Sequence, residues 1–229
     1  MARLLLVPVL VPVLVAGLLA TSYAAPASAA TAAGDRQALH LRAAVRALPV
    51  AAETPSGYDR DLFRHWVDAD GDCQDTREEV LVAESRVPIG GCTITTGEWF
   101  SWYDGATWTD ASDVDIDHLV PLKEAWDSGA RGWDAATRER YANDLGDPRT
   151  LVAVTDNVNQ SKGDRDVAEW LPDHRVCRYV RSWVAVKLRF GLTVDPAERS
   201  VLVARARRCP DRVVRFVTVP TARRVGMDP

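Results

Sequence analysis

One histidine of this chain lies in a setting suited to acid–base chemistry. The chain has four histidines, and His118 alone follows a run in which acidic and apolar residues alternate, Asp113-Val114-Asp115-Ile116-Asp117. The alternation predicts a strand whose polar face carries three carboxylates. Asp is unfavourable in strands, and like charges held side by side cost free energy unless a cation offsets them. The run therefore predicts either a metal or catalytic site at His118, or an exposed edge strand.

A second polar segment follows a predicted buried strand at 150–155 and is polar enough to open a helix. The order Asp117-His118-x-x-Pro121-Leu122, buried strand, Asn159-x-x-Lys162-Gly163-Asp164 resembles the ββα-metal motif of HNH nucleases. The segments 68–73 and 168–172 are similar to the exported HNH nucleases of actinobacteria, and the resemblance extends from Tyr58 to about Cys209. It implies an α+β fold with a ββα-metal (HNH) core, additional helices and two disulfides. The implied activity is that of an extracellular, metal-dependent endonuclease that hydrolyses the phosphodiester bonds of DNA, with RNA left open.

The same resemblance gives the central residues their roles. His118 matches the general base, because an imidazole with a pKa near 6.5 can take a proton from water near neutrality. Asp117 and Asn159 match the metal ligands, and their hard oxygens suit Mg²⁺ or Mn²⁺. Adjacent strand residues point to opposite faces, so Asp117 and His118 can serve one phosphate only if the strand is kinked there.

The chain departs from the HNH pattern at two positions. The middle Asn of the motif, which orients the base histidine through a backbone contact, is matched here by Thr150. Either the Thr150 hydroxyl takes over this role, or Asn143 or Asp147 does. Gly163 stands where some members place another ligand. This leaves two protein ligands and a metal held largely by water and nucleic acid.

Three basic side chains near these motifs are candidates for phosphate contacts. Lys162 and Arg165 can hold flanking phosphates, as a point charge and as a fork respectively. Arg77 follows an acidic loop and is a third candidate. The alternative is that these side chains are exposed on a helix surface. No recognition helix or zinc finger is evident in the sequence, which predicts little sequence preference.

The acidic loop indicates a different function. Asp68, Asp70, Asp72 and Glu79 have the 1, 3, 5 and 12 spacing of an EF-hand, but Cys73 stands at position 6, where such loops need glycine. The loop predicts either a structural Ca²⁺ site or a solvated turn. The alternative to a nuclease is therefore a non-catalytic secreted calcium-binding module. His118 distinguishes the two, because a calcium module has no use for it.

The N-terminus and the cysteines predict an exported protein. Residues 1–29 have the n-, h- and c-regions of a signal peptide, ending in Ala27-Ser28-Ala29. A membrane anchor is the competing interpretation, but the apolar run 4–19 is short for a span of about 20 residues and contains two prolines. Cleavage leaves no membrane attachment. The cysteines predict two disulfides, and sequence proximity favours Cys73–Cys92 and Cys177–Cys209, although a zinc site and other connectivities stay open.

The predicted organisation is a signal peptide (1–29), a flexible N-terminal arm (30–57), a nuclease domain (58–212) and a C-terminal tail (213–229). Helices are expected at 134–146, at 173–190 and from an N-cap at Asp195. The net charge is −4, but residues 173–229 contain thirteen Arg or Lys against five Asp or Glu. This basic end predicts either contact with a polyanion such as DNA or a solvated pair of helices. No obligate protein partner is predicted.

Overall fold

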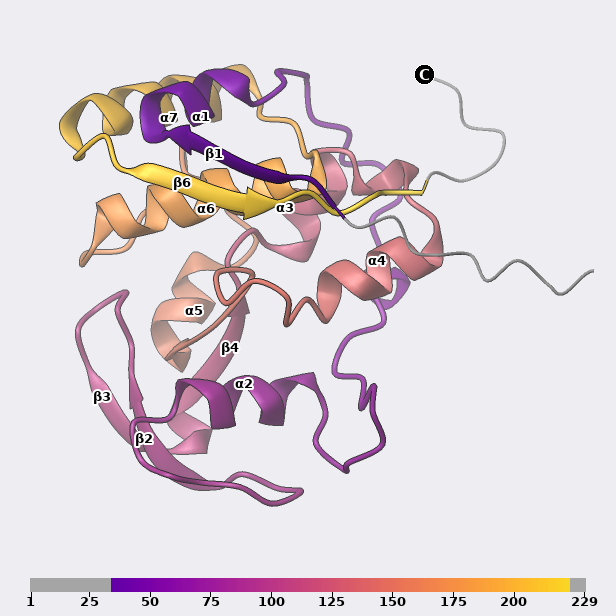
Figure 1. Ribbon diagram of the computed structural model, residues 1–229, viewed down its shortest axis with the longest axis vertical. Helices are drawn as coiled ribbons and strands as arrows, with labels where there is room; N and C mark the ends of the chain where they lie inside the picture. Colours follow the sequence, from indigo (N-terminus) through magenta and orange to yellow (C-terminus); the bar gives the residue numbers. More distant parts are fainter. Residues whose placement is uncertain (1–33, 223–229) are drawn as a thin grey trace, which may run out of the picture. The chain divides into compact units, whose positions relative to one another are not determined.

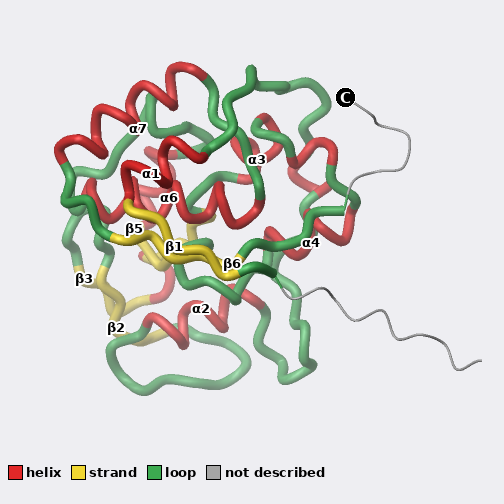
Figure 2. The backbone as a smooth tube through the Cα atoms, turned by 45° about the horizontal axis from the view of Figure 1, so that its top comes forward, coloured by secondary structure: helices red, strands yellow, loops and turns green. Residues whose placement is uncertain are grey.

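The computed structural model describes residues 34–222 and arranges them as a mixed α/β fold with short strands (Figures 1 and 2). Its strands are β1 (Arg36–His40), β2 (Thr96–Phe100), β3 (Thr107–Asp110), β4 (Val114–His118), β5 (Leu151–Thr155) and β6 (Val213–Val217). The α-helices are α1 (Leu41–Ala47), α2 (Thr76–Glu84), α3 (Leu122–Asp127), α4 (Ala135–Ala142), α5 (Asp156–Lys162), α6 (Val176–Phe190) and α7 (Pro196–Arg208). Three 3₁₀ turns complete the set: η1 (Arg60–Leu62), η2 (Ala111–Asp113) and η3 (Ala130–Gly132). The predicted signal peptide lies outside the described residues.

The strands pair in three antiparallel two-stranded sheets, β1 with β6, β2 with β3 and β4 with β5. The first pair corrects two expectations. Residues 30–57 were predicted to be a loose arm, yet β1 lies beside β6 with His40 opposite Val213, and Leu41 and Val45 of α1 are buried. The tail predicted at 213–229 begins with β6, whose alternating burial fits a strand with one covered face. Each strand needs a partner from the other end of the chain, a relation that local sequence patterns do not contain.

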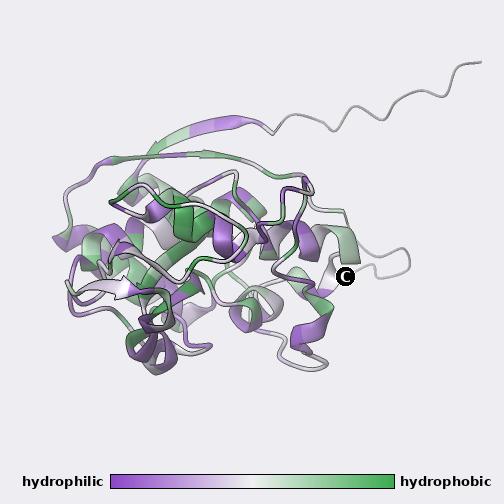
Figure 3. Cartoon of the chain, turned by 90° about the horizontal axis from the view of Figure 1, so that it is seen from below, coloured by the Kyte–Doolittle hydropathy of each residue, from purple (hydrophilic) through white to green (hydrophobic). Residues whose placement is uncertain are grey.

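Helix α6 forms the centre of the larger core. It is buried along most of its length, and α1, α7 and β6 contact it. Figure 3 colours the chain by hydropathy and shows strongly hydrophobic stretches toward the middle of the view, with many hydrophilic stretches nearer its edge. The helix ends at Gly191, whose φ of 63° is the left-handed conformation that glycine adopts without steric cost. Helix α7 begins as predicted, with the Asp195 carboxylate accepting from the backbone N–H groups of Ala197 and Glu198.

A second, smaller core lies between α2, β2 and the β4–β5 pair. Leu151 and Ala153 of β5 belong to this smaller core, whereas Val152 and Val154 belong to the larger one. Strand β5 is therefore apolar at consecutive positions because both of its faces are covered. This places the β4–β5 pair between the two cores, where its carboxyl-rich strand is held rigidly.

Two disulfides join the cysteines as sequence proximity favoured. Cys73–Cys92 closes the segment around the acidic loop, and Cys177–Cys209 links the start of α6 to the end of α7. Among the described residues, no helix has both the length and the apolar character that a membrane span requires.

The larger core also contains a buried lysine with two carboxylates. Lys187 Nζ lies 2.5 Å from Glu124 Oε1 and 2.7 Å from Glu198 Oε2, and all three side chains are buried. It also donates to Ser128 Oγ and to the carbonyl of Thr193. One ammonium cannot neutralise two carboxylates, and burial raises the pKa of Glu198 to about 8. Folding therefore favours the neutral form of Glu198 relative to the unfolded chain.

This raised pKa predicts how stability depends on pH. The neutral form of Glu198 is favoured by folding, so its contribution is complete below the unfolded pKa of 4.5 and is lost as pH rises through about 8. We expect the free energy of unfolding of the parent to fall between pH 6 and 8.5, by at most about 1.4 kcal/mol per pH unit. The melting temperature should fall with it. Glu198→Gln cannot ionise and should flatten this decline, whereas Glu169→Gln, at an exposed position, should not. Parallel melting curves for parent and Glu198→Gln would show that Glu198 is already ionised in the folded protein.

Candidate functional site

The candidate site lies where β4 ends against α5. Strand β4 pairs with β5 so that Asp117 is opposite Val152 and His118 is opposite Leu151, and α5 contacts both strands. Opposite residues of an antiparallel pair share a face, so Asp117 faces the larger core and His118 faces the smaller one. A pocket of about 190 Å³ lies at this strand end and is lined by Asp117, His118 and Asn159. The structure thus brings the predicted base and both predicted ligands to one pocket, although they come from opposite faces of a strand and from a helix.

The imidazole of His118 is buried and held in one orientation. Its Nε2 lies 2.8 Å from the carbonyl oxygen of Ala142, which can only accept, so Nε2 carries the proton. The ring also contacts the rings of Trp66 and Tyr141, with centroids 5.6 and 6.3 Å away. Burial lowers the pKa of His118 to about 3. The ring is therefore neutral near pH 7, and its Nδ1 makes no hydrogen bond to residues 34–222, while the lowered pKa makes this nitrogen a weaker proton acceptor than that of a free imidazole.

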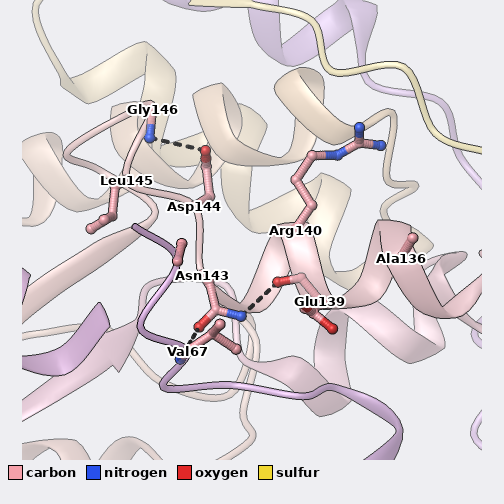
Figure 4. Close-up of a pocket in the computed structure, with 9 residues that line it drawn as sticks. Val67, Ala136, Glu139, Arg140, Asn143, Asp144, Leu145 and Gly146 are labelled. Atoms are coloured by element: carbon pink, nitrogen blue, oxygen red, sulfur yellow. Dashed lines mark hydrogen bonds between the residues drawn. The ribbon is translucent and has the colours of Figure 1, made fainter. Parts of the chain in front are cut away.

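The carbonyl that orients His118 is fixed by the neighbouring Asn143. The Asn143 side chain accepts from Val67 N and from Thr76 Oγ1. It also donates to the carbonyls of Arg64 and Glu139, at 2.7 and 2.8 Å. Figure 4 shows this amide bridging the chain at Val67 to the last turn of α4. Asn143 therefore holds the chain next to the Ala142 carbonyl that accepts from His118 Nε2.

This finding separates the alternatives left open for the orienting residue. Thr150 does not reach His118, because its hydroxyl donates to Asp144 Oδ2 at 2.7 Å. Asp147 is paired with Arg149. Of these three residues, only Asn143 directly follows Ala142, whose carbonyl His118 contacts, and its side chain anchors the backbone there.

Asp117 is buried and both of its oxygens have partners. Lys162 Nζ lies 2.7 Å from Oδ1, and the Tyr103 hydroxyl donates to Oδ2 at 2.6 Å. Burial raises the pKa of Asp117, while the Lys162 ammonium and these two hydrogen bonds act in the opposite direction. Each carboxylate oxygen has a second lone pair, so the partners orient Asp117 without using all of its acceptor capacity.

Asn159 presents its amide oxygen as a potential ligand. Its Nδ2 donates to Asp115 Oδ2 at 3.1 Å, and Oδ1 has no hydrogen-bond partner among the described residues. The pocket thus offers a carboxylate and an amide oxygen, and Gln160 and Asp164 also line it. This set of hard oxygen donors fits a cation such as Mg²⁺ or Mn²⁺ that keeps several waters.

The predicted phosphate contacts are placed differently from one another. Lys162 is fully buried, and its ammonium is occupied by Asp117 and by the carbonyl of His118 at 3.0 Å, so it is not available to a phosphate. Arg77 is held by the carbonyls of Ala111 and Val114, where it joins α2 to the start of β4. Arg165 is exposed beyond the end of α5 and uses only its Nε, which donates to the carbonyl of Lys162.

Three of the four residues of the acidic loop gather, and Glu79 does not belong to their cluster. Oxygens of Asp68, Asp70 and Asp72 lie within 4.8 Å of one another, and all three residues are exposed. The pKa of Glu79 is raised, first by burial and then by these three carboxylates. Cys73 has a φ of 78°, the left-handed conformation for which an EF-hand loop uses glycine.

Several residues of the site were not found from the sequence. Tyr103 lies in the segment between β2 and β3, and Arg60 of η1 lines the pocket from far upstream. The contact to His118 comes from the Ala142 backbone, which no side-chain pattern can reveal. A buried carboxylate such as Asp117 needs a charged or hydrogen-bonding partner, and only the fold identifies this partner as Lys162.

The segment that carries this site is similar to a domain of known nucleases. The model of the family described as GmrSD restriction endonucleases, C-terminal domain, matches residues 92–204, which include Asp117, His118 and Asn159. The match supports assignment to a nuclease family. A protein of Arthroderma benhamiae named "Uncharacterized secreted protein" is 45% identical over 194 residues, which are 82% of this chain and 94% of that protein. The chain belongs to the family of this secreted protein. No solved structure matches it.

Proposed function

We propose that this chain is an exported, metal-dependent endonuclease of HNH type that hydrolyses phosphodiester bonds in DNA with little sequence preference. The observation that carries the proposal is the pocket at the end of β4, where a neutral, oriented histidine lies beside two oxygen donors. The match of residues 92–204 to a restriction endonuclease domain supports it. The actinobacterial resemblance stays a prediction, as does cleavage of RNA.

His118 would act as the general base. Nε2–H is fixed on the Ala142 carbonyl, so the proton acceptor is Nδ1. This nitrogen takes a proton from a water molecule, the water oxygen forms a bond to phosphorus, and the bond to the leaving oxygen breaks. Since the ring is held by Ala142, Trp66 and Tyr141, it does not have to be ordered during the reaction.

Asp117 and Asn159 would hold the metal ion. A bound Mg²⁺ or Mn²⁺ supplies positive charge that stabilises the phosphate oxygens as the bond breaks. Tyr103 and Lys162 orient Asp117, and Asp115 orients Asn159. Lys162 also offsets the charge of Asp117, so two protein ligands alone would bind the cation weakly, and substrate phosphate would complete its surroundings.

Arg60 and Arg165 are the side chains best placed to hold the substrate phosphate. Both are exposed; Arg60 lines the pocket, and Arg165 follows the pocket residues Gly163 and Asp164. A guanidinium presents a planar fork that matches two phosphate oxygens. Arg60 would therefore fill the phosphate-binding role for which the sequence suggested Lys162 and Arg77, and Arg165 keeps the role suggested for it.

A calcium-binding module explains less of the structure. The acidic loop accounts for Asp68, Asp70 and Asp72, but it gives no reason to bury and orient His118, Asp117 and Lys162 at the end of β4. Export is supported by the two disulfides and by the secreted relative. These observations favour the extracellular nuclease.

The direct experiment is a plasmid-nicking assay on the purified protein after signal removal. We expect supercoiled plasmid to be converted to nicked and linear forms, EDTA to abolish the conversion, and excess Mg²⁺ or Mn²⁺ to restore it. An assay with Ca²⁺ alone separates catalysis from binding to the acidic loop. Intact plasmid in every metal would contradict the proposed function.

Asn159→Ala should raise the metal concentration needed for half-maximal cleavage by on the order of ten-fold or more, because an oxygen ligand is lost. The rate at saturating metal should change less. Asn157→Ala is the matched control, since Asn157 is exposed on the same helix and does not line the pocket. Metal titrations of plasmid cleavage compare the two, and coincident curves for Asn159→Ala and the parent would remove Asn159 from the ligand set.

A further inference from the structure

A second hollow of about 700 Å³ lies apart from the catalytic pocket and shares no lining residue with it. We call it the basic groove. Its walls come from β1, α6, β6 and the segment before β5, and it is lined by His40, Arg149, Arg178, Arg181, Ser182, Asp211, Arg212, Val213 and Arg215. These segments lie side by side in Figure 1 around the β1–β6 pair and α6.

Four guanidiniums of the basic groove form no salt bridge with the described residues, although the charge of Glu84 acts on Arg178. Arg178, Arg181, Arg212 and Arg215 form no ion pair with the described residues, and none is fully buried. The remaining two charged groups are already occupied. Arg149 is paired in bidentate fashion with Asp147, and the Asp211 carboxylate accepts from the backbone N–H of Arg42. The groove therefore concentrates unneutralised positive charge.

Two of its arginines are held in place. Arg178 lies over the ring of Trp102, 4.4 Å from the centroid, and Arg149 donates to the carbonyl of Arg215 at 2.6 Å. The pKa of Arg181 is lowered by burial and then by the charges of Arg212 and Arg149. Neighbouring like charges destabilise the fold, and a bound polyanion relieves the repulsion.

We propose that the basic groove binds the sugar–phosphate backbone of a nucleic-acid strand outside the catalytic pocket. The inference rests on the proposed function and extends it from the reacting phosphate to the flanking chain. A row of guanidiniums in a concave surface suits successive phosphates. Val213 is the sole apolar lining residue, so the groove offers little surface for insertion into a lipid layer.

The structure thereby divides the basic C-terminal region in two. Arg178, Arg181, Arg212 and Arg215 belong to the groove, whereas Arg205, Arg207 and Arg208 lie in the last turn of α7 and do not line it. Three arginines changed in each set give two variants with the same loss of charge.

The test compares two triple variants of the full mature protein. The groove variant is Arg181→Gln, Arg212→Gln, Arg215→Gln; the control is Arg205→Gln, Arg207→Gln, Arg208→Gln, with the same loss of charge. Binding of a long DNA oligonucleotide is measured in EDTA at several salt concentrations, and hydrolysis of bis(p-nitrophenyl) phosphate is measured with metal. This small ester is too short to reach from the pocket into the groove.

We expect the groove variant to lose DNA affinity by on the order of 10–100-fold and its salt dependence to flatten by about 0.9 per lost phosphate contact. Its hydrolysis of the small ester and its melting temperature should match the control. Equal affinity loss in both variants, or no DNA binding by the parent, would overturn the proposal. So would unchanged DNA binding with a loss of binding to heparin or to anionic vesicles, because the occupant would then be another polyanion.

The binding arm contains no metal and needs no turnover. A parent protein that binds DNA through the groove but cleaves neither substrate would refute the proposed function and leave the groove supported. If the parent cleaves the small ester but the groove variant binds DNA as tightly as the parent, the proposed function is supported and the groove proposal is refuted.

Discussion

His118→Ala is expected to lower the rate of plasmid cleavage by about 10²- to 10⁴-fold, because the water molecule loses its proton acceptor. DNA affinity measured in EDTA should stay close to that of the parent, since neither Arg60, Arg165 nor the basic groove is changed. The rate loss and the binding are measured on the same preparation. His174→Ala serves as the control, because His174 is exposed and does not line the pocket.

Burial of the imidazole makes a second readout necessary. His118 is 5% exposed and bonded to Ala142, so its removal leaves a cavity as well as an unpaired carbonyl. That cavity lies between the ring contacts of Trp66 and Tyr141 and has the size of an imidazole. Added imidazole should restore part of the activity of His118→Ala. Full activity in the variant would refute the assignment, and lost activity without rescue, together with a collapsed melting transition, would assign His118 to the fold.

Asn143→Ala separates the base from the residue that positions it. Asn143 does not line the catalytic pocket at the end of β4, yet it fixes the chain that carries the Ala142 carbonyl. If it acts through His118, its loss should lower kcat with little change in KM. A general loss of folded protein also lowers the apparent kcat at unchanged KM, so the folded fraction is measured in parallel, and the expected fall is one in kcat per folded molecule.

The sequence predicted those parts of the site that depend on local pattern. The alternation at 113–118 gave β4, the apolar run at 150–155 gave β5, and the polar stretch after it gave α5. Asp117, His118 and Asn159 meet at one pocket because two strands and the following helix form a compact unit. The disulfides followed from proximity along the chain.

What the sequence could not supply depends on contacts between distant segments. Lys162 was expected either to hold a flanking phosphate or to be exposed on a helix surface. Its burial requires the carboxylate of Asp117, forty-five residues earlier. Strands β1 and β6 were missed because they pair with each other although they lie near opposite ends of the sequence. Thr150 was one of three candidates to orient His118, suggested by its offset from Asn159, but in the structure its hydroxyl donates to Asp144 instead.

The buried pair of Lys162 and Asp117 gives the other prediction with a large expected effect. Lys162→Met keeps a similar apolar volume but leaves Asp117 as a buried carboxylate without a cation. Breaking a buried ion pair from one side costs about 3–5 kcal/mol. At about 2–4 °C per kcal/mol for a domain of this size, the melting temperature should fall clearly in EDTA. Adding Asp117→Asn should recover part of the loss, because the buried charge is then gone.

Metal ions make this variant a test of the ligand assignment. If Asp117 is a ligand, its uncompensated charge in Lys162→Met should bind Mg²⁺ or Mn²⁺ more tightly than in the parent, and binding to the folded state stabilises it by RT ln(1 + [L]/Kd). The rise in melting temperature on adding metal should therefore be larger in Lys162→Met than in the parent, and smallest in the double variant. The same experiment with Asp68→Asn added excludes a contribution from the acidic loop. An equal metal-dependent rise in all these variants would mean that Asp117 is a structural partner of Lys162 and Tyr103, and that the cation is held by other oxygens.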